Sequence, residues 1–222
     1  MQPETFVHLH NHSDFSLLDG ASKVENLAET AARMGMPALA MTDHGNVFGA
    51  YDFWKQAKQQ GFNPRIASVG KALLFPAFIE AMGPTAEGLT IAAGWSPSHP
   101  FRSSLTGATA ARIAADYTRR TERQWTQPIG FAHALFEVAI DVLRRAGTPD
   151  DRRAIVRAIA ATELDTVVGR VSWATGPLPN IAKTPLVGGQ WRRGGSFPFE
   201  LAIVSNRAHP EIGLTGQLGA IV

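Results

Sequence analysis

The stretch FVHLHNH at residues 6–12 and the stretch TDHG at residues 42–45 decide the fold of the N-terminal part of this chain. Every second residue of the first stretch is a histidine (His8, His10 and His12). Because successive side chains of a β-strand point to opposite faces, a strand here places the three imidazoles on one face.

A helix is expected between these two stretches. Residues 22–25 read SKVE, the pattern of a capping box, and an apolar stripe at helical spacing ends at Gly35. Residues 37–41 then read as a buried strand, with TDHG at its carboxyl end. This β-α-β unit delivers polar side chains to the carboxyl edge of a parallel sheet, where α/β proteins build their sites.

These polar residues are typical of a metal site. Two imidazoles at i and i+2, such as His10 and His12, can share a metal ion, and nearby carboxylates such as Asp19 can bridge or orient a second ion. Histidine and aspartate without cysteine suit Zn²⁺, Mn²⁺ or Fe²⁺, which activate water for phosphoester hydrolysis. The alternative is a surface strand with no ligand role. Asp43 and His44 at the next strand end favour the metal site.

The motifs FVHLHNHS (6–13), LLDG (17–20) and MTDHGN (41–46) resemble the start of the polymerase and histidinol phosphatase (PHP) domain of bacterial DNA polymerase III alpha subunits. The resemblance covers about residues 4–57. It implies a (β/α) barrel with a multinuclear metal site and, in some members, phosphoesterase or 3′–5′ exonuclease activity on a phosphoester or DNA-end substrate. The residues it implies as metal contacts are His10, His12, Asp19 and His44. His8 is a weaker ligand candidate, and Asp43 is expected to orient its neighbours.

The chain departs from the PHP pattern after the second helix. Where the family has a Gly-x-Glu strand end, residues 64–70 read PRIASVG, without a glutamate. His99, His133 and His209 lie outside the family's motifs, and the polymerase domains are absent. We therefore expect no DNA synthesis from this chain, and the sequence leaves open whether it is an enzyme.

The remainder of the chain reads as alternating helices and strands punctuated by glycine and proline. The apolar stripe expected for the helix at 128–145 consists of Phe131, Leu135, Val138, Ala139, Val142 and Leu143. The expected helices are 53–61, 71–82 (interrupted at Pro76), 107–121, 128–145 and 148–161, and the expected strands are 65–69, 89–93, 166–173, 185–191 and 197–204.

Four further motifs resemble the C-terminal part of ABC-transporter substrate-binding proteins of the branched-chain amino-acid type: KALLFP (71–76), WSPSHPF (95–101), PIGFA (128–132) and TPLVGGQW (184–191). The resemblance covers about residues 53–210 and implies one lobe of a two-lobed periplasmic receptor for a small amino-acid ligand. Trp95 and Ser96, in a loop after a strand, are candidate ligand-binding residues. The alternative is that Trp95 packs beneath that loop.

The predicted fold class is α/β throughout. Residues 1–57 are a truncated start of a PHP (β/α) barrel, and residues 58–222 are an α/β lobe of a periplasmic-binding-protein-like fold. The helix at residues 53–57 fits both families, which predicts a chimeric chain. Three functions stay open: a metal-dependent phosphoesterase fragment, an amino-acid-binding lobe, and a chimera without selected activity.

Composition and charge exclude several further classes of function. The net charge is only +2 over 222 residues and the basic residues are scattered in pairs, so charge gives no case for a nucleic-acid groove. The chain has no cysteine, which excludes disulfides and thiolate metal sites. The N-terminus lacks the features of an export signal, and no apolar run approaches the ~20 residues of a membrane span. These features predict a cytoplasmic chain, and its oligomeric state stays open.

Overall fold

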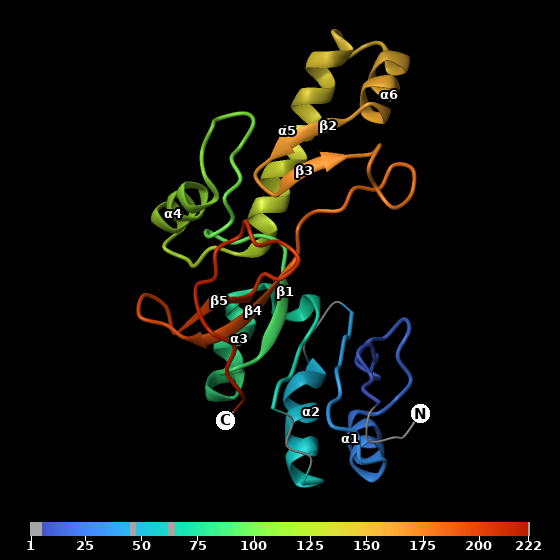
Figure 1. The fold of residues 1–222 in the computed structure, drawn as a ribbon, viewed down its shortest axis with the longest axis vertical. Coiled ribbons are helices and arrows are strands. Elements are labelled where there is room, and N and C mark those ends of the chain that lie inside the picture. The colour runs from blue at the N-terminus through green and yellow to red at the C-terminus, as the bar shows by residue number, and fades with distance from the viewer. Residues whose placement is uncertain (1–5, 45–47, 62–64, 222) are drawn as a thin grey trace. The chain divides into compact units, whose positions relative to one another are not determined.

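The structure, a computed structural model, describes residues 6–44, 48–61 and 65–221 (Figure 1). The chain forms two compact units. Unit 1 contains Met1–Ala92, Gly188–Ser205 and Gly216–Val222, and unit 2 contains Ala93–Val187 and Asn206–Thr215. The boundary predicted at residue 57 separates two segments by the families that they resemble. The division into compact units does not test it, so it stays a prediction.

Parallel pairing connects the N-terminal strand segments of unit 1. His8 pairs with Leu39, Met41 with Val69, and Ser68 with Thr90, and all three bridges are parallel. The segments around residues 8, 40 and 68 and strand β1 (Thr90–Ala93) therefore lie side by side in chain order. Helices α1 (Val24–Arg33) and α2 (Phe48–Gln59) follow the first two segments and pack against each other (Figure 1). The β-α-β unit expected from the sequence is confirmed.

Helix α1 buries the stripe that the sequence predicts, but it begins differently. Val24, Ala28 and Ala31 are buried. The predicted capping box is wrong, because the N-cap is Lys23 and no side chain caps the helix. Ser22 instead pairs with Ser13, and its carbonyl accepts a hydrogen bond from the Asp14 N–H at 2.9 Å. Pairing to the preceding loop takes Ser22 away from the cap position.

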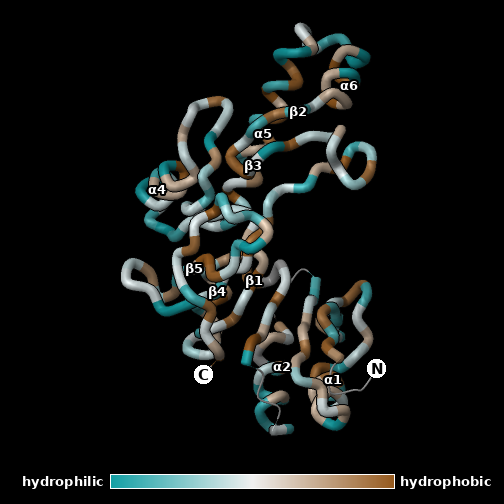
Figure 2. Tube along the Cα trace, viewed as in Figure 1, coloured by the Kyte–Doolittle hydropathy of each residue, from teal (hydrophilic) through white to brown (hydrophobic). Residues whose placement is uncertain are grey.

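The rest of unit 1 extends the sheet beyond β1. A 3-10 helix, η2 (Lys71–Leu74), and helix α3 (Pro76–Met82) confirm the predicted interruption at Pro76, and the short 3-10 helix η3 (Gly83–Ala86) follows. The strand order is β1-β4-β5, with β4 (Val187–Arg193) antiparallel to β5 (Phe199–Ser205). Trp191 of β4 is buried and donates its indole N–H to the Leu73 carbonyl at 3.1 Å. The trace at β4 and β5 is brown in part in Figure 2, and Val187, Leu201 and Ile203 of these strands are buried.

Unit 2 consists of three helices and a hairpin. Helices α4 (Ala110–Thr121), α5 (Gln127–Ala146) and α6 (Arg152–Ala160) precede the antiparallel strands β2 (Glu163–Thr166) and β3 (Gly169–Ser172). The single strand predicted at 166–173 is wrong, because the chain turns at Val167 and Val168. These two side chains are buried in the core beside Trp95, so their β-branched, apolar character reflects burial in a turn. Gly169, with φ +103°, completes the turn in a conformation that favours glycine.

Helix α5 does not bury the stripe that its sequence predicts. Its buried residues are Gln127, Gly130, Ala134, Glu137 and Val142. Of the predicted stripe only Val142 is among them, and Leu135 is 67% exposed. In the described part of unit 2, the core lies against the face that carries small and polar residues. Periodicity identified the apolar face correctly, but not which face meets the core.

Candidate functional site

Three of the predicted metal-site residues come together in unit 1. His12 follows the first strand segment, Asp19 lies in the next loop, and His44 follows the segment around Met41. The Asp19 Oδ2 atom lies 3.0 Å from His12 Nδ1 and 2.9 Å from His44 Nδ1. One ligand atom of each residue lies within 4.8 Å of the others, so the three side chains form a cluster that could hold a metal ion.

Ser16 holds the loop that carries Asp19. Its hydroxyl donates to Asp19 Oδ1 at 2.6 Å and accepts the His44 backbone N–H at 3.0 Å. The Ser16 hydrogen bond is the main cause that lowers the pKa of the Asp19 carboxyl, and the charges of His12 and His44 lower it further against the opposing effect of desolvation. Asp19 is therefore ionised at neutral pH and available to a cation.

Asp43 has a different position from Asp19. It is buried, and its carboxylate accepts the Ser13 N–H at 2.5 Å and the Ser13 hydroxyl at 2.6 Å. Both oxygen atoms are thus engaged by the residue that follows His12. This geometry agrees with the interpretation of Asp43 as a residue that orients its neighbours.

The other two histidines lie along the same segment. The rings of His10 and His12 are 4.6 Å apart, and those of His12 and His44 are 4.4 Å apart. His8 instead contacts Phe6 edge-to-face, with 4.6 Å between ring centroids. Among the described residues, the cluster of close ligand atoms contains His12, Asp19 and His44, with the His10 ring tilted against His12. The ligand role of all four residues stays a prediction.

The environment of His12 fits a divalent cation. Its Nε2 atom is buried and has no hydrogen-bond partner among the residues described. A metal-bound histidine typically donates one ring N–H to a carboxylate and binds the ion through the other nitrogen, as the Asp19 contact and the unpaired Nε2 allow. The spacing also suits direct ligation, because cis ligand atoms about 2.1 Å from one ion lie about 3 Å apart. In the first arrangement Asp19 orients His12 without binding the ion, and in the second Asp19 is itself a ligand.

Trp95 and Ser96, the predicted ligand-binding pair, lie inside unit 2. Trp95 is fully buried, its ring meets Trp125 edge-to-face at 5.9 Å, and Gly130 leaves room for it. The Ser96 hydroxyl is buried and lies 2.9 Å from His99 Nδ1. Trp95 therefore packs as the alternative interpretation expects, and neither side chain lines the pocket of this unit.

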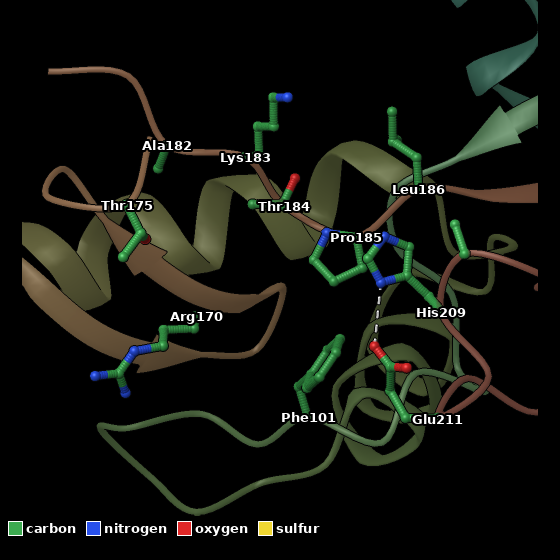
Figure 3. Close-up of a pocket in the computed structure, with 11 residues that line it drawn as sticks. Phe101, Arg170, Thr175, Ala182, Lys183, Thr184, Pro185, Leu186, His209 and Glu211 are labelled. Atoms are coloured by element: carbon green, nitrogen blue, oxygen red, sulfur yellow. Dashed lines mark hydrogen bonds and ion pairs between the residues drawn. The ribbon is translucent and has the colours of Figure 1, made fainter. Parts of the chain in front are cut away.

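Sequence reasoning did not find that pocket as a site. It has a volume of about 930 Å³ and lies entirely within unit 2 (Figure 3). The motif at residues 184–191 contributes Thr184, Pro185 and Leu186 to its wall, which was the available signal. The lining consists of Phe101, Arg170, Thr175, residues 182–186, Ala208, His209 and Glu211.

Three contacts between oppositely ionisable side chains border the pocket. His209 Nδ1 lies 3.2 Å from Glu211 Oε1, as the dashed line in Figure 3 marks. Arg170 of β3 donates to Glu163 at 2.6 Å and to Asp165 at 3.2 Å. These hydrogen bonds, that to Glu163 first, raise the pKa of the Arg170 guanidinium. The charge of Arg170 is thus largely offset within its own hairpin.

The fold belongs to the mixed α/β class and is similar to that of periplasmic binding proteins. A leucine-binding protein of Thermotoga maritima superposes with a TM-score of 0.63 at 16% identity, covering 91% of this chain and 61% of its own. A branched-chain amino-acid transporter protein of Rhodopseudomonas palustris gives 0.62 at 10% identity, covering 95% and 62%. At these identities the likeness concerns the fold alone.

The N-terminal third is similar to the PHP domain of DNA polymerase III alpha subunits. Residues 8–82 match the PHP domain family model, so the match continues past residue 57. The alpha subunit of Saccharopolyspora erythraea is 54% identical over 66 residues, and that of Mycobacterium tuberculosis is 52% identical over 62. The first alignment covers 30% of this chain and the chain spans only 6% of that relative's length. The two kinds of likeness are consistent with the predicted chimeric composition.

Within residues 6–44, 48–61 and 65–221, no helix combines the length and the hydrophobicity needed to cross a bilayer.

Proposed function

We propose that the PHP segment binds a divalent metal ion through His12, Asp19 and His44, with His10 beside them, and forms a partial phosphoesterase site. The observation that carries the proposal is the position of Asp19 Oδ2 within 3.0 Å of an Nδ1 atom of both histidines. Imidazole and carboxylate donors without sulfur suit Zn²⁺, Mn²⁺ or Fe²⁺.

The side chains define what such a site does with a phosphoester or a DNA end. A bound divalent ion lowers the pKa of water and neutralises phosphate oxygens. Asp19, held by Ser16, fixes the orientation of both imidazoles. The His44 side chain is 58% exposed, so the site is open to a substrate from solvent. Because no glutamate is present at residues 68–70, we expect metal binding with slow hydrolysis.

Calorimetric titration of Zn²⁺ and Mn²⁺ into the chelator-treated chain tests this proposal. His12→Ala and Asp19→Ala are expected to abolish binding, whereas His8→Ala, which removes an exposed histidine outside the cluster, is the matched control. Unchanged binding in His12→Ala and Asp19→Ala would refute the site. Hydrolysis of a chromogenic phosphodiester tests the chemical step separately, and its metal-dependent part should disappear in Asp19→Ala.

The pocket of unit 2 supports a second candidate function, the binding of a small organic ligand. Structures similar in fold include the leucine-binding protein and a solute-binding protein of Rhodopseudomonas palustris in complex with 3,4-dihydroxy benzoic acid. We propose a ligand of that size, and branched-chain amino acids are the first compounds to test. A rise in melting temperature with leucine, isoleucine or valine supports this function. If neither metal nor small ligand binds, the chain is a chimera without selected activity.

A further inference from the structure

We propose that the exposed face of helix α5 is a docking surface for a second copy of this chain, so that two copies pair through antiparallel α5 helices. Pairing of this kind requires neither the metal site of unit 1 nor the pocket of unit 2. Three properties of the face support it: its composition, its lack of charge and its area.

The exposed face of α5 is apolar over about three turns. The two most exposed side chains on it, Leu135 and Phe136, are 67% and 66% exposed. With 3.6 residues per turn, the exposed apolar residues of the helix fall within an arc of about 140°. They are Phe131, Ala132, Leu135, Phe136, Ala139 and Leu143. We call these six residues the α5 stripe.

The charged groups of α5 lie outside this stripe. Glu137 is buried and accepts hydrogen bonds within unit 2, His133 lies 2.7 Å from the Ser103 hydroxyl, and Arg145 pairs with Asp141 at 2.7 Å. Arg144 lies about 80° beyond the edge of the stripe. Two copies therefore bring their stripes together without opposing like charges, and the centres of protein interfaces are depleted of charge in the same way.

The area of the stripe matches that of a weak dimer interface. With about 150–250 Å² for each large apolar side chain, the exposed fractions leave about 500 Å² of apolar surface on one copy. The largest apolar patch on a typical monomer measures about 300–600 Å² and is often functional. Two paired stripes would remove about 1,000 Å² from water, the lower limit for a specific interface.

A second copy fits the stripe because the stripe is complementary to itself. Antiparallel packing about a two-fold axis near the middle of the stripe places Leu135 of one copy against Ala139 of the other. A large side chain thus meets a small one at both of these contacts, as close packing of helices requires. Phe131 then lies near Leu143 of the second copy at each end. The same surface serves both copies, which is the property of an isologous interface.

Analytical ultracentrifugation of the full chain from about 1 to 200 µM tests the pairing, and a reversible monomer–dimer equilibrium with a micromolar Kd is expected. A chelator in the buffer prevents metal ions from bridging two copies through their histidines. A chain that stays monomeric throughout would overturn the proposal. Binding to phosphatidylcholine vesicles without self-association would also overturn it, because a lipid surface would then be the occupant.

Variants locate the interface. Leu135→Glu and Phe136→Glu each introduce a charge into the paired stripes and should weaken pairing at least about tenfold. Both positions are exposed in the single chain, so thermal melting should be unchanged. Leu178→Glu, at a position 62% exposed in a loop of unit 2, is the matched control and should pair as the wild type does. Unchanged pairing in both α5 variants would refute the assignment to this face.

Cross-linking tests the same contact without a charged substitution. The chain has no cysteine, so Ala139→Cys introduces a single thiol at the middle of the stripe. A bismaleimide of about 10 Å span, similar to the separation of packed helix axes, should join two such copies. Ala161→Cys, exposed in unit 2 outside the stripe, should give little covalent dimer. Equal yields from the two variants, or no dimer from Ala139→Cys, would overturn the proposal.

Discussion

Buried His99 should make the stability of unit 2 depend on pH in the mildly acidic range. Its side chain is 2% exposed, Nδ1 lies 2.9 Å from the Ser96 hydroxyl, and Nε2 has no partner among the described residues. Burial lowers the pKa of His99 from 6.5 to about 4, although a hydrogen bond to the Ser96 backbone and the charge of Glu211 raise it and the charge of His209 lowers it. The folded protein thus keeps this imidazole neutral where the unfolded chain protonates it.

The sign and size of the effect follow from linkage. The folded pKa lies below the unfolded value, so the stabilising contribution is complete above pH 6.5 and is lost as the pH falls toward about 4. A shift of this size corresponds to at most about 3 kcal/mol. Between pH 7 and pH 5 the expected loss is about 2 kcal/mol, or roughly 4–8 °C in melting temperature.

Thermal unfolding followed by tryptophan fluorescence at pH 7, 6 and 5 measures this loss. Other groups titrate over the same range, so the informative quantity is the difference between the wild type and His99→Gln, which has no imidazole at this position. His133→Gln serves as the control, because His133 lies in the same unit and pairs with Ser103 at 2.7 Å. If His99→Gln loses as much stability between pH 7 and pH 5 as the wild type and the control, the reasoning is wrong.

Three further changes test packing and the metal site. Glu137→Ala should lower the free energy of unfolding by about 2–4 kcal/mol, because the buried Glu137 carboxylate accepts the Val167 N–H at 3.0 Å and two hydrogen bonds from Ser104. Chemical denaturation measures this loss, and exposed Glu163→Ala is the control. Gly130→Ala should lower the free energy of unfolding, measured by denaturation, by about 1–3 kcal/mol, because a Cβ there would lie 2.2–2.5 Å from the Trp95 ring. The control Gly195→Ala, where a Cβ meets open space, should leave the stability unchanged. Asp43→Asn should weaken metal binding about 10–100-fold by calorimetry, because the bonds to Ser13 support the neighbouring His12; exposed Asp52→Asn is the control, and equal affinities would refute this role.

The N-terminal site was predictable because its residues lie in distinctive local motifs. The alternation at residues 6–12 and the polar strand end at 42–45 together predict that His12 and His44 meet, and the structure places their rings 4.4 Å apart. The role of Ser16, which bonds both Asp19 and His44, was not predictable, because a serine in a loop has no distinctive pattern. Local pattern thus predicted the participants, whereas the loop conformation determined how they are held.

Unit 2 was harder to predict because the residues that meet there carry no distinctive local pattern. Glu137 looks like a solvent-facing helix residue in the sequence, yet its carboxylate satisfies backbone groups at Ser104 and Val167, about thirty residues away on either side. The pocket combines residues from Phe101 to Glu211, and no spacing rule connects them. The prediction that the apolar stripe of α5 is buried was wrong for the same reason, since periodicity does not determine which surface a helix meets.

The two likenesses of this chain are compatible because a parallel β-α-β unit has the same local form in a barrel and in an open sheet. The segments around residues 8, 40 and 68 and strand β1 lie in chain order, as barrel strands would. Beyond β1, however, the neighbouring strand is β4, followed by β5, which is antiparallel to β4. The edge at which a barrel would continue is therefore occupied, and the sheet stays open.

The metal site lacks the carboxylate of the PHP pattern because the sequence has no glutamate at this strand end, and steric crowding is not the cause. The strand end without a glutamate lies at Gly70, beside Thr42 at the same sheet edge as His44. A Cβ at Gly70 would meet the Thr42 Cα at 3.8 Å, an ordinary contact. The surroundings of Gly70 thus leave space for a side chain at this strand end. His12, Asp19 and His44 keep their arrangement without it, which is why we expect metal binding to persist while hydrolysis is slow.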